Sequence, residues 1–348
     1  MTKRPHTTVM IVPTGVGAAI GGYAGDALPV ARAIAAVTDR LITHPNVLNG
    51  AQLYWPLPNA YYVEGYGLDQ FAAGRWHLQP VHQNSIGLVL DQAMDDHLRW
   101  RHLQAADAAR ATLGLDIRGY VTTDAPLGVH LQQAQAATWG TLERPDSLLR
   151  AAEQLLQAGC SAIAVVARFP DDEDSAALAA YRQGAGVDPL AGAEAVISHL
   201  VVRQFQVPCA HAPALQPLPL DPTISPRSAA EELGYTFLPC VLAGLSRAPQ
   251  FSTEAQGASI SAHDIDTLVV PASTLGGSAV LSLSQTNTQI IAVQNNTTAL
   301  AVDAAALGLR VVTVNSYLEA VGAIATQRAG IALAPLSPSM AQIAPLTP

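Results

Sequence analysis

The sequence predicts an α/β protein in which two lobes, each built on a largely parallel sheet flanked by helices, enclose a cleft. Three observations support this fold class. Short continuous apolar runs, such as TTVMIVP at 7–13, alternate with helical stretches rich in alanine and leucine, a pattern typical of parallel sheets covered on both faces. Hydrophobic residues make up 49% of the chain and charged residues 13%, which indicates a large buried core. A proline-rich stretch at 207–227 separates two such series, so we expect two Rossmann-like lobes.

The composition excludes several classes of protein. The chain has 348 residues, a net charge of −9 and only 18 lysines and arginines, without a basic cluster, whereas a nucleic-acid binder needs a positive surface. Its apolar runs fall short of the roughly 20 residues that a membrane span needs. Three cysteines without CxxC spacing fit a reducing compartment and argue against structural zinc. We therefore expect a cytoplasmic protein that binds neither nucleic acid nor a membrane.

The first series of elements defines an N-terminal lobe over residues 1–206. Its apolar, β-branched segments predict strands, and its alanine- and leucine-rich segments predict helices. In the last helix, Asp188 is expected to be the N-cap and Pro189 to occupy the first helical position. The predicted strands span 7–13, 40–45, 85–91, 116–124 and 161–170, and the predicted helices span 26–37, 95–114, 144–159 and 188–205.

The second series defines a C-terminal lobe over residues 228–348. Between the lobes, the proline-rich stretch 207–227 predicts an extended connector. After it, the strands at 266–271, 289–294 and 310–315 are each followed by a helical stretch. We expect a compact βαβαβα unit here.

A glycine-rich loop follows the first predicted strand. Ligands of parallel α/β sheets lie beyond the carboxyl ends of the strands, where the N–H groups at helix N-termini attract anions. The spacing of the glycines is close to the dinucleotide fingerprint, but the best helix cap, Asp26, comes late and the next strand lacks a terminal acidic residue. The loop therefore has three readings: an anion or polar-substrate site, a dinucleotide site, or glycines that serve turn geometry alone. The candidate ligand-binding glycines are Gly15, Gly17, Gly21 and Gly22.

Two further strand exits, the segments that directly follow a strand, and one loop carry groups that fit acid–base chemistry. The second strand ends in THPNVLN, where His44 is titratable and Asn46 and Asn49 offer amides for ligand binding. Glu64 lies in a loop between tyrosines, and Asp124 follows the strand at 116–124. We expect His44, Glu64 and Asp124 to be the catalytic candidates; the alternatives are a capped turn and solvated loop carboxylates.

The C-terminal strands end in more small polar residues than helix capping requires. Neighbouring parallel strands bring their exits to one edge of the sheet, so these residues predict a ligand-binding surface. They are Ser273, Thr274, Gly276, Gly277, Asn295, Asn296, Thr297 and Asn315.

A last polar group lies between residues 188 and 211. Asp188, His199 and His211 could form a metal or acid–base set, but their spacing matches no metal-ligand signature. The sequence therefore predicts no metal site.

Several motifs together carry a family resemblance. They are PTGVGAAIGGYAGDA, ITHPNVLNGA, GVDPLAGAEAVISH, CAHAPA and FLPCVLAGLSRAP. Over nearly its whole length the chain resembles an uncharacterised, mainly cyanobacterial family known only as a domain of unknown function. The resemblance implies a cytoplasmic protein that forms one integrated unit, and it implies no activity.

These observations favour an enzyme that acts on a small polar or anionic metabolite in the cleft between the lobes. A lyase, isomerase or transferase fits the residues best, and no cofactor is identified. One alternative is an NAD(P)-dependent oxidoreductase that uses the glycine loop, and another is a non-catalytic metabolite-binding protein. A homo-oligomer is compatible with each reading.

Overall fold

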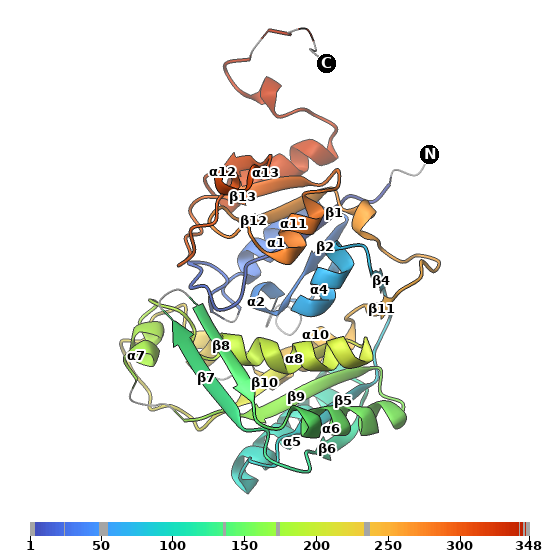
Figure 1. Cartoon of the computed structure of the whole chain (residues 1–348), viewed down its shortest axis with the longest axis vertical. Coiled ribbons are helices and arrows are strands. Elements are labelled where there is room, and N and C mark those ends of the chain that lie inside the picture. The colour runs from blue at the N-terminus through green and yellow to red at the C-terminus, as the bar shows by residue number, and fades with distance from the viewer. Residues whose placement is uncertain are drawn as a thin grey trace.

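The computed structural model describes residues 4–23, 25–48, 55–134, 137–171, 175–232 and 237–340, together with 342, 343 and 345. Its largest sheet has six strands in the order β14-β13-β12-β1-β2-β3, and every neighbouring pair is parallel. These strands are β1 (Thr7–Met10), β2 (Arg40–Thr43), β3 (Ala60–Tyr62), β12 (Thr267–Pro271), β13 (Gln289–Val293) and β14 (Val312–Val314). We call this part the six-stranded lobe; it fills the upper half of Figure 1.

Helices cover both faces of the six-stranded sheet, which explains why its strands are apolar throughout. All four residues of β1 are buried, and successive side chains point to opposite faces. Met10 joins a core with Ile34 of α1, whereas Val9 joins a second core with Phe71 of α4. The helices of this lobe are α1 (Leu28–Val37), α2 (Pro45–Leu48), α4 (Gly65–Ala72), α11 (Ser278–Leu283), α12 (Ala304–Leu307) and α13 (Tyr317–Arg328), with 3₁₀ turns η1 (Ala262–Asp264) and η2 (Ala334–Leu336).

The second main sheet has four parallel strands in the order β10-β9-β5-β6. They are β5 (Ile86–Leu90), β6 (Ile117–Thr122), β9 (Ala162–Arg168) and β10 (Cys209–Ala214). An antiparallel hairpin, β7 (Val129–Ala134) and β8 (Ala137–Leu142), packs on α8. The helices of this four-stranded lobe are α5 (Asp96–Leu113), α6 (Pro145–Gln157), α7 (Ala176–Arg182), α8 (Ala191–Phe205), α9 (Ala229–Glu232) and α10 (Leu238–Ser246). In Figure 1, α8 runs along the side of this lobe that faces the six-stranded lobe.

Two short strands join the lobes. The chain leaves the six-stranded lobe through β4 (His77–Gln79) and returns through β11 (Gln250–Ser252), and the two pair antiparallel. Asn84 fastens this junction, because its side chain is buried and donates to the carbonyl oxygens of Leu245 and Ala248, both at 2.8 Å. The two lobes are thus connected by a paired ribbon.

The predicted fold class is confirmed, since both main sheets are parallel and flanked by helices. The domain boundaries expected from the sequence, 1–206, 207–227 and 228–348, stay a prediction. The two main sheets, however, are not divided at these boundaries. Strands β1–β3 pair with β12–β14, which lie beyond the connector. Within the expected connector, residues 209–214 form the buried edge strand β10, where Pro213 is tolerated because an edge strand has one unpaired side.

Helix α8 begins at Ala191, not at 188, and Asp188 accepts the N–H of Leu190 at 2.8 Å.

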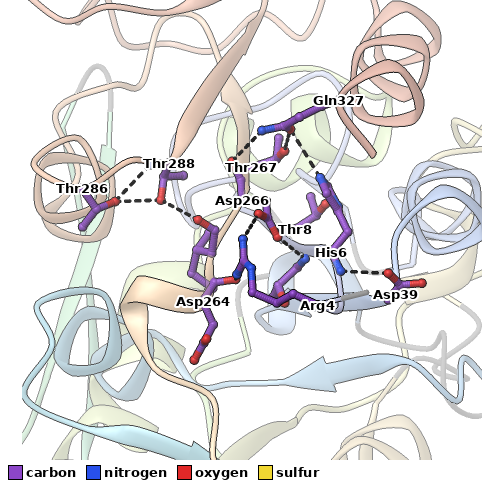
Figure 2. A network of polar contacts seen from close by, with 12 residues as sticks. Arg4, His6, Thr8, Asp39, Asp264, Asp266, Thr267, Thr286, Thr288 and Gln327 are labelled. Atoms are coloured by element: carbon purple, nitrogen blue, oxygen red, sulfur yellow. Dashed lines mark hydrogen bonds and ion pairs between the residues drawn. The ribbon is translucent and has the colours of Figure 1, made fainter. Parts of the chain in front are cut away.

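A polar network closes the six-stranded sheet at the end opposite the strand exits (Figure 2). The carboxylate of Asp266 accepts the backbone N–H of Thr7 at 2.8 Å and pairs with Arg4. His6 bridges Thr38, at 3.1 Å, and Gln327 of α13, at 3.4 Å. These contacts tie the starts of β1 and β12 to α13 and leave the carboxyl ends of the strands to form the site.

Candidate functional site

A cavity of about 360 Å³ lies between the two lobes. One wall is made by residues at the carboxyl ends of β1, β2, β3 and β12, and the other by α8, β10 and α9. This is where parallel α/β sheets bind ligands, and the volume suits a small molecule.

Glu64 lies directly after β3 and caps the N-terminus of α4. Its Oε2 accepts the backbone N–H groups of Tyr66 at 2.8 Å and Gly67 at 3.1 Å, which is the capping arrangement that satisfies free helix donors. Its Oε1 lies 2.9 Å from Nε2 of His199, on α8 of the other lobe. The carboxylate is therefore buried and oriented, with both oxygens occupied.

His199 is held by this carboxylate and still reaches the cavity, since its side chain is 41% exposed. Burial alone would lower its pKa, but the hydrogen bond and charge of Glu64, with the charge of Asp69, outweigh burial and raise it. Gly65 makes the close approach possible, because a Cβ at that position would lie 2.9 Å from Nε2 of His199. Because Nε2 contacts Glu64, any proton exchanged with a ligand would have to pass through Nδ1.

One face of α8 supplies most of the opposite wall. The lining residues Ala191, Glu194, Ala195, Ser198 and His199 recur at the three- and four-residue spacing of a single helix face. The small side chains of Ala191 and Ala195 leave room for the cavity, while the other three bring polar groups to it. His211 of β10 lies beside this face.

Burial raises the pKa values of several carboxyl groups around the cavity. Burial raises the pKa of Asp188 to about 6. Burial, with the charges of Asp188 and Glu231, raises the pKa of Glu194 well above its usual range. Asp69 faces the cavity from α4, and burial raises its pKa as well. Perturbed acids gathered in a cavity are typical of functional sites.

Cations are scarce around this cavity. Of the described residues that line it, none is lysine or arginine, whereas five are aspartate or glutamate. No group of three or more His, Cys, Asp or Glu side chains suited to hold a metal ion occurs within the described ranges.

The structure brings two of the expected site residues at the β2 exit to the cavity. His44 lines it, but its Nε2 accepts the backbone N–H of Val12 at 3.1 Å, and burial lowers its pKa to about 4. Asn46 also lines it, with its amide donating to the carbonyl oxygens of Val12 at 2.9 Å and Pro13 at 3.2 Å. Both residues therefore support the strand exit. Asn49 lies outside the described residues.

In the glycine loop, Gly22 lines the cavity, whereas Gly15, Gly17 and Gly21 do not. Gly15 and Gly17 have positive φ and lie against the four-stranded lobe, where Cβ atoms would meet Thr138 Oγ1 at 2.8 Å and the Gly186 carbonyl at 2.9 Å. The backbone N–H groups of Ala19, Ile20 and Gly21 are already bonded to Thr297, Asn296 and Asp26. Much of the loop is thus used for contacts within the protein.

The C-terminal exits divide into two groups. Thr274 and Gly277 line the cavity. The others of that set do not: Ser273 contacts Thr298 at 2.8 Å, Asn296 is buried between Ile20 and Tyr317, and Asn315 bonds Glu319. Gly276, Asn295 and Thr297 are exposed and are likewise absent from the lining.

Asp124 also lies apart from the cavity lining. It is exposed and forms a surface ion pair with Arg150 at 2.7 Å. The hydrogen bonds from Arg150 and Ser147 lower its pKa to about 2, so it behaves as a surface carboxylate.

The polar residues of the cavity that the sequence did not predict include Asp69, Glu194, Ser198 and Glu231. For α8, a signal was present. Glu194 and Ser198 are four residues apart, as are Ala195 and His199, so polar and small residues share one helix face. Asp69 and Glu231 carry no such signal.

Comparison with known proteins identifies a family. Residues 7–337 match the family described as "Protein of unknown function (DUF3326)". The chain is 63% identical over 341 residues to a protein of Synechococcus sp. named "Uncharacterized lipoprotein", and the match covers 97% of this chain and 95% of that protein. No solved structure matches. Among the described helices, none is both long and apolar enough to cross a bilayer. The match over nearly the whole length shows that the chain belongs to the DUF3326 family, which the residue motifs had already indicated.

Proposed function

We propose that this protein is an enzyme that transfers protons on a small polar metabolite bound between the lobes. The observation that carries the proposal is the contact of 2.9 Å between Glu64 of one lobe and His199 of the other, inside the cavity. A carboxylate that orients a histidine is a recurrent arrangement in general acid–base catalysis.

The roles follow from the contacts. Glu64 keeps the imidazole in place and stabilises its protonated form, because both of its oxygens are fixed. His199 is the acid–base group, since it reaches the cavity with one ring nitrogen free of Glu64. Lyase and isomerase chemistry fit this pair best, as both need a proton moved at a carbon atom.

The charge of the cavity favours a neutral or positively charged ligand over an anion. Glu64, Asp69 and Asp188 are among its acidic lining residues, and no lysine or arginine is found among the described residues around it. An anionic ligand would have to rely on backbone N–H groups, and three of those in the glycine loop are already bonded. In place of the polar or anionic metabolite expected from the sequence, we therefore propose an uncharged or cationic polar molecule as the ligand.

The same hydrogen bonds argue against a nicotinamide dinucleotide. The fingerprint loop binds pyrophosphate through free N–H groups, and here those of Ala19, Ile20 and Gly21 serve the protein itself.

The test is a comparison of small-molecule consumption. Purified protein is incubated with a polar extract of a cyanobacterium, and the compounds lost or formed are followed by mass spectrometry. We expect His199→Gln and Glu64→Gln to abolish the changes that the wild type causes. The exposed residues His82 and Glu153 provide matched controls, so His82→Gln and Glu153→Gln should retain activity. A compound that binds and is never converted would identify a metabolite-binding protein instead.

The location in the cell is proposed on separate grounds. The buried thiols of Cys160, Cys209 and Cys240 fit a reducing cytoplasm, whereas the Synechococcus relative is named a lipoprotein. Fractionation of cells decides between the two: recovery in the soluble fraction supports a cytoplasmic enzyme, and recovery with membranes supports a lipid-anchored one.

A further inference from the structure

Three side chains on the α8 side of the cavity form a series of polar contacts separate from the Glu64–His199 pair. Ser198 Oγ lies 3.1 Å from Nδ1 of His211, and Nε2 of His211 lies 3.8 Å from Oε2 of Glu194. Ser198 is fully buried, while the side chains of His211 and Glu194 are 13% and 18% exposed. All three line the cavity. The Glu64–His199 pair makes no use of them.

A serine, a histidine and a glutamate in series point to one of two chemistries. In the first, Ser198 is a nucleophile and His211 is its base, which requires a basic imidazole. In the second, Glu194 is an acid, and the other two residues lie beside it in the cavity wall. The contact at 3.8 Å is too long for a strong hydrogen bond and leaves the Glu194 carboxyl able to turn toward a ligand.

The electrostatic surroundings favour the second chemistry. Burial, reinforced by the charge of His199, lowers the pKa of His211 to about 3, so its imidazole is a weak base. Burial and the charges of Asp188 and Glu231 raise the pKa of Glu194. This direction favours the protonated carboxyl group that a general acid needs.

We propose that Glu194 is a second catalytic residue of the cleft, which delivers a proton to an oxygen atom of the bound molecule while His199 takes one from carbon. His211 and Ser198 line the cavity beside it. This inference rests on the proposed function and specifies its substrate class, an uncharged or cationic carbonyl compound with a C–H bond next to the carbonyl group.

The step balances without a further reactant. His199 removes the proton of the C–H bond, and that electron pair becomes the C=C bond. The carbonyl π electrons pass to oxygen, which receives the proton of Glu194, and an enol results. Glu194 then takes back the proton of the enol oxygen, the carbonyl group re-forms, and the same carbon atom receives a proton from solvent on its opposite face, which completes an isomerisation at that carbon.

The protonation of Glu194 can be measured on the full chain without a substrate. Glutamate labelled with ¹³C at its carboxyl group is incorporated, and NMR spectra are recorded between pH 5 and pH 8. We expect one carboxyl resonance of the wild type to remain in the protonated form at pH 7. It should be missing from Glu194→Gln and retained in Glu153→Gln. Loss of the assigned protonated resonance by pH 7 in the wild type overturns the proposal.

Two further measurements address the chemistry. A fluorophosphonate probe should leave Ser198 unmodified, whereas its labelling would show a nucleophilic serine and overturn the assignment. In the extract assay run in D₂O, products should carry carbon-bound deuterium, and Glu194→Gln should slow their formation by about 100-fold or more. Products without deuterium overturn the enol step. If the Glu194 carboxyl is protonated but no compound is consumed, the proposed function fails while the protonation state stands.

Discussion

The contact between Glu64 and His199 joins the two lobes inside the cavity through a single pair of side chains, 2.9 Å apart. Glu64 was expected to be functional as a carboxylate in a loop between tyrosines, and it does lie in the cavity. Its partner could not be predicted, because His199 is 135 positions away on the other lobe. His44 was also expected to be catalytic and also lines the cavity, yet its Nε2 accepts the backbone N–H of Val12. The pattern of a strand exit identifies the location of a group but not its hydrogen-bond partner.

At the residue scale, the first prediction concerns Gly65. A Cβ at this position would lie 2.9 Å from Nε2 of His199, so Gly65→Ala should push the imidazole away from Glu64. We expect the pKa of His199, measured by NMR, to fall toward its ordinary value. Gly119→Ala is the control, because that Cβ would meet nothing within 4 Å. An unchanged His199 titration in Gly65→Ala would contradict this geometry.

A second residue-scale prediction concerns the charge of Glu64. The hydrogen bond and charge of this carboxylate raise the pKa of His199 against the effect of burial. Glu64→Gln removes the charge, so burial should then dominate and the pKa should fall below about 6.5, the usual histidine value. The ring protons of His199 report the change by NMR. A pKa that stays raised in Glu64→Gln would assign the effect to Asp69 alone.

At the scale of elements, α8 connects the fold to the site. Its outer face lines the cavity, and the start of the helix packs on β8 with almost no space between the backbones. A Cβ on Gly192 would lie 2.3 Å from both the Thr138 carbonyl oxygen and the Trp139 Cα. The sequence predicted this helix, which begins at Ala191, but no local pattern encodes its close contact with the hairpin.

The third prediction tests that packing. Gly192→Ala should lower the free energy of unfolding by about 3 kcal/mol, because backbone atoms have no room to move aside. The measurement is the denaturant midpoint at constant m-value. Gly322→Ala in α13 is the matched helical control, since its Cβ would meet nothing within 4 Å; it should be neutral or stabilise by up to about 1 kcal/mol. Equal midpoints for the two variants would contradict the observed contact.

At the scale of the whole molecule, the fold class was predictable and the pairing of distant strands was not. Continuous apolar strands alternating with helices specified two parallel sheets. The register of β1 with β12, in which Thr8 pairs with Thr267, depends on chain segments that local periodicity cannot relate. For the same reason the proline-rich stretch was read as a connector, although part of it is the edge strand β10.

The acidic and histidine groups of the cleft also determine how stability depends on pH. The pKa values of Glu194 and His199 are raised in the folded protein, so the folded state holds these protons more tightly than the unfolded chain does. Their contribution is therefore lost as pH rises through the folded pKa values. His44 and His211, with pKa values of about 4 and 3, act in the opposite sense and only below about pH 6.5. Above about pH 6.5, Glu194 and His199 therefore dominate the pH dependence of the free energy of unfolding.

The fourth prediction follows from that balance. Between pH 6.5 and pH 8.0, we expect the free energy of unfolding to fall, by at most about 1.4 kcal/mol per pH unit for each proton held. Glu194→Gln has no proton to lose there, so its slope should be shallower than that of the wild type. Glu153→Gln, at an exposed position of α6, should keep the wild-type slope. The measurement is chemical denaturation at both pH values. A slope unaltered by Glu194→Gln would mean that this carboxyl is ionised at neutral pH, and the second wall of the cavity would then hold one more negative charge and no proton to deliver.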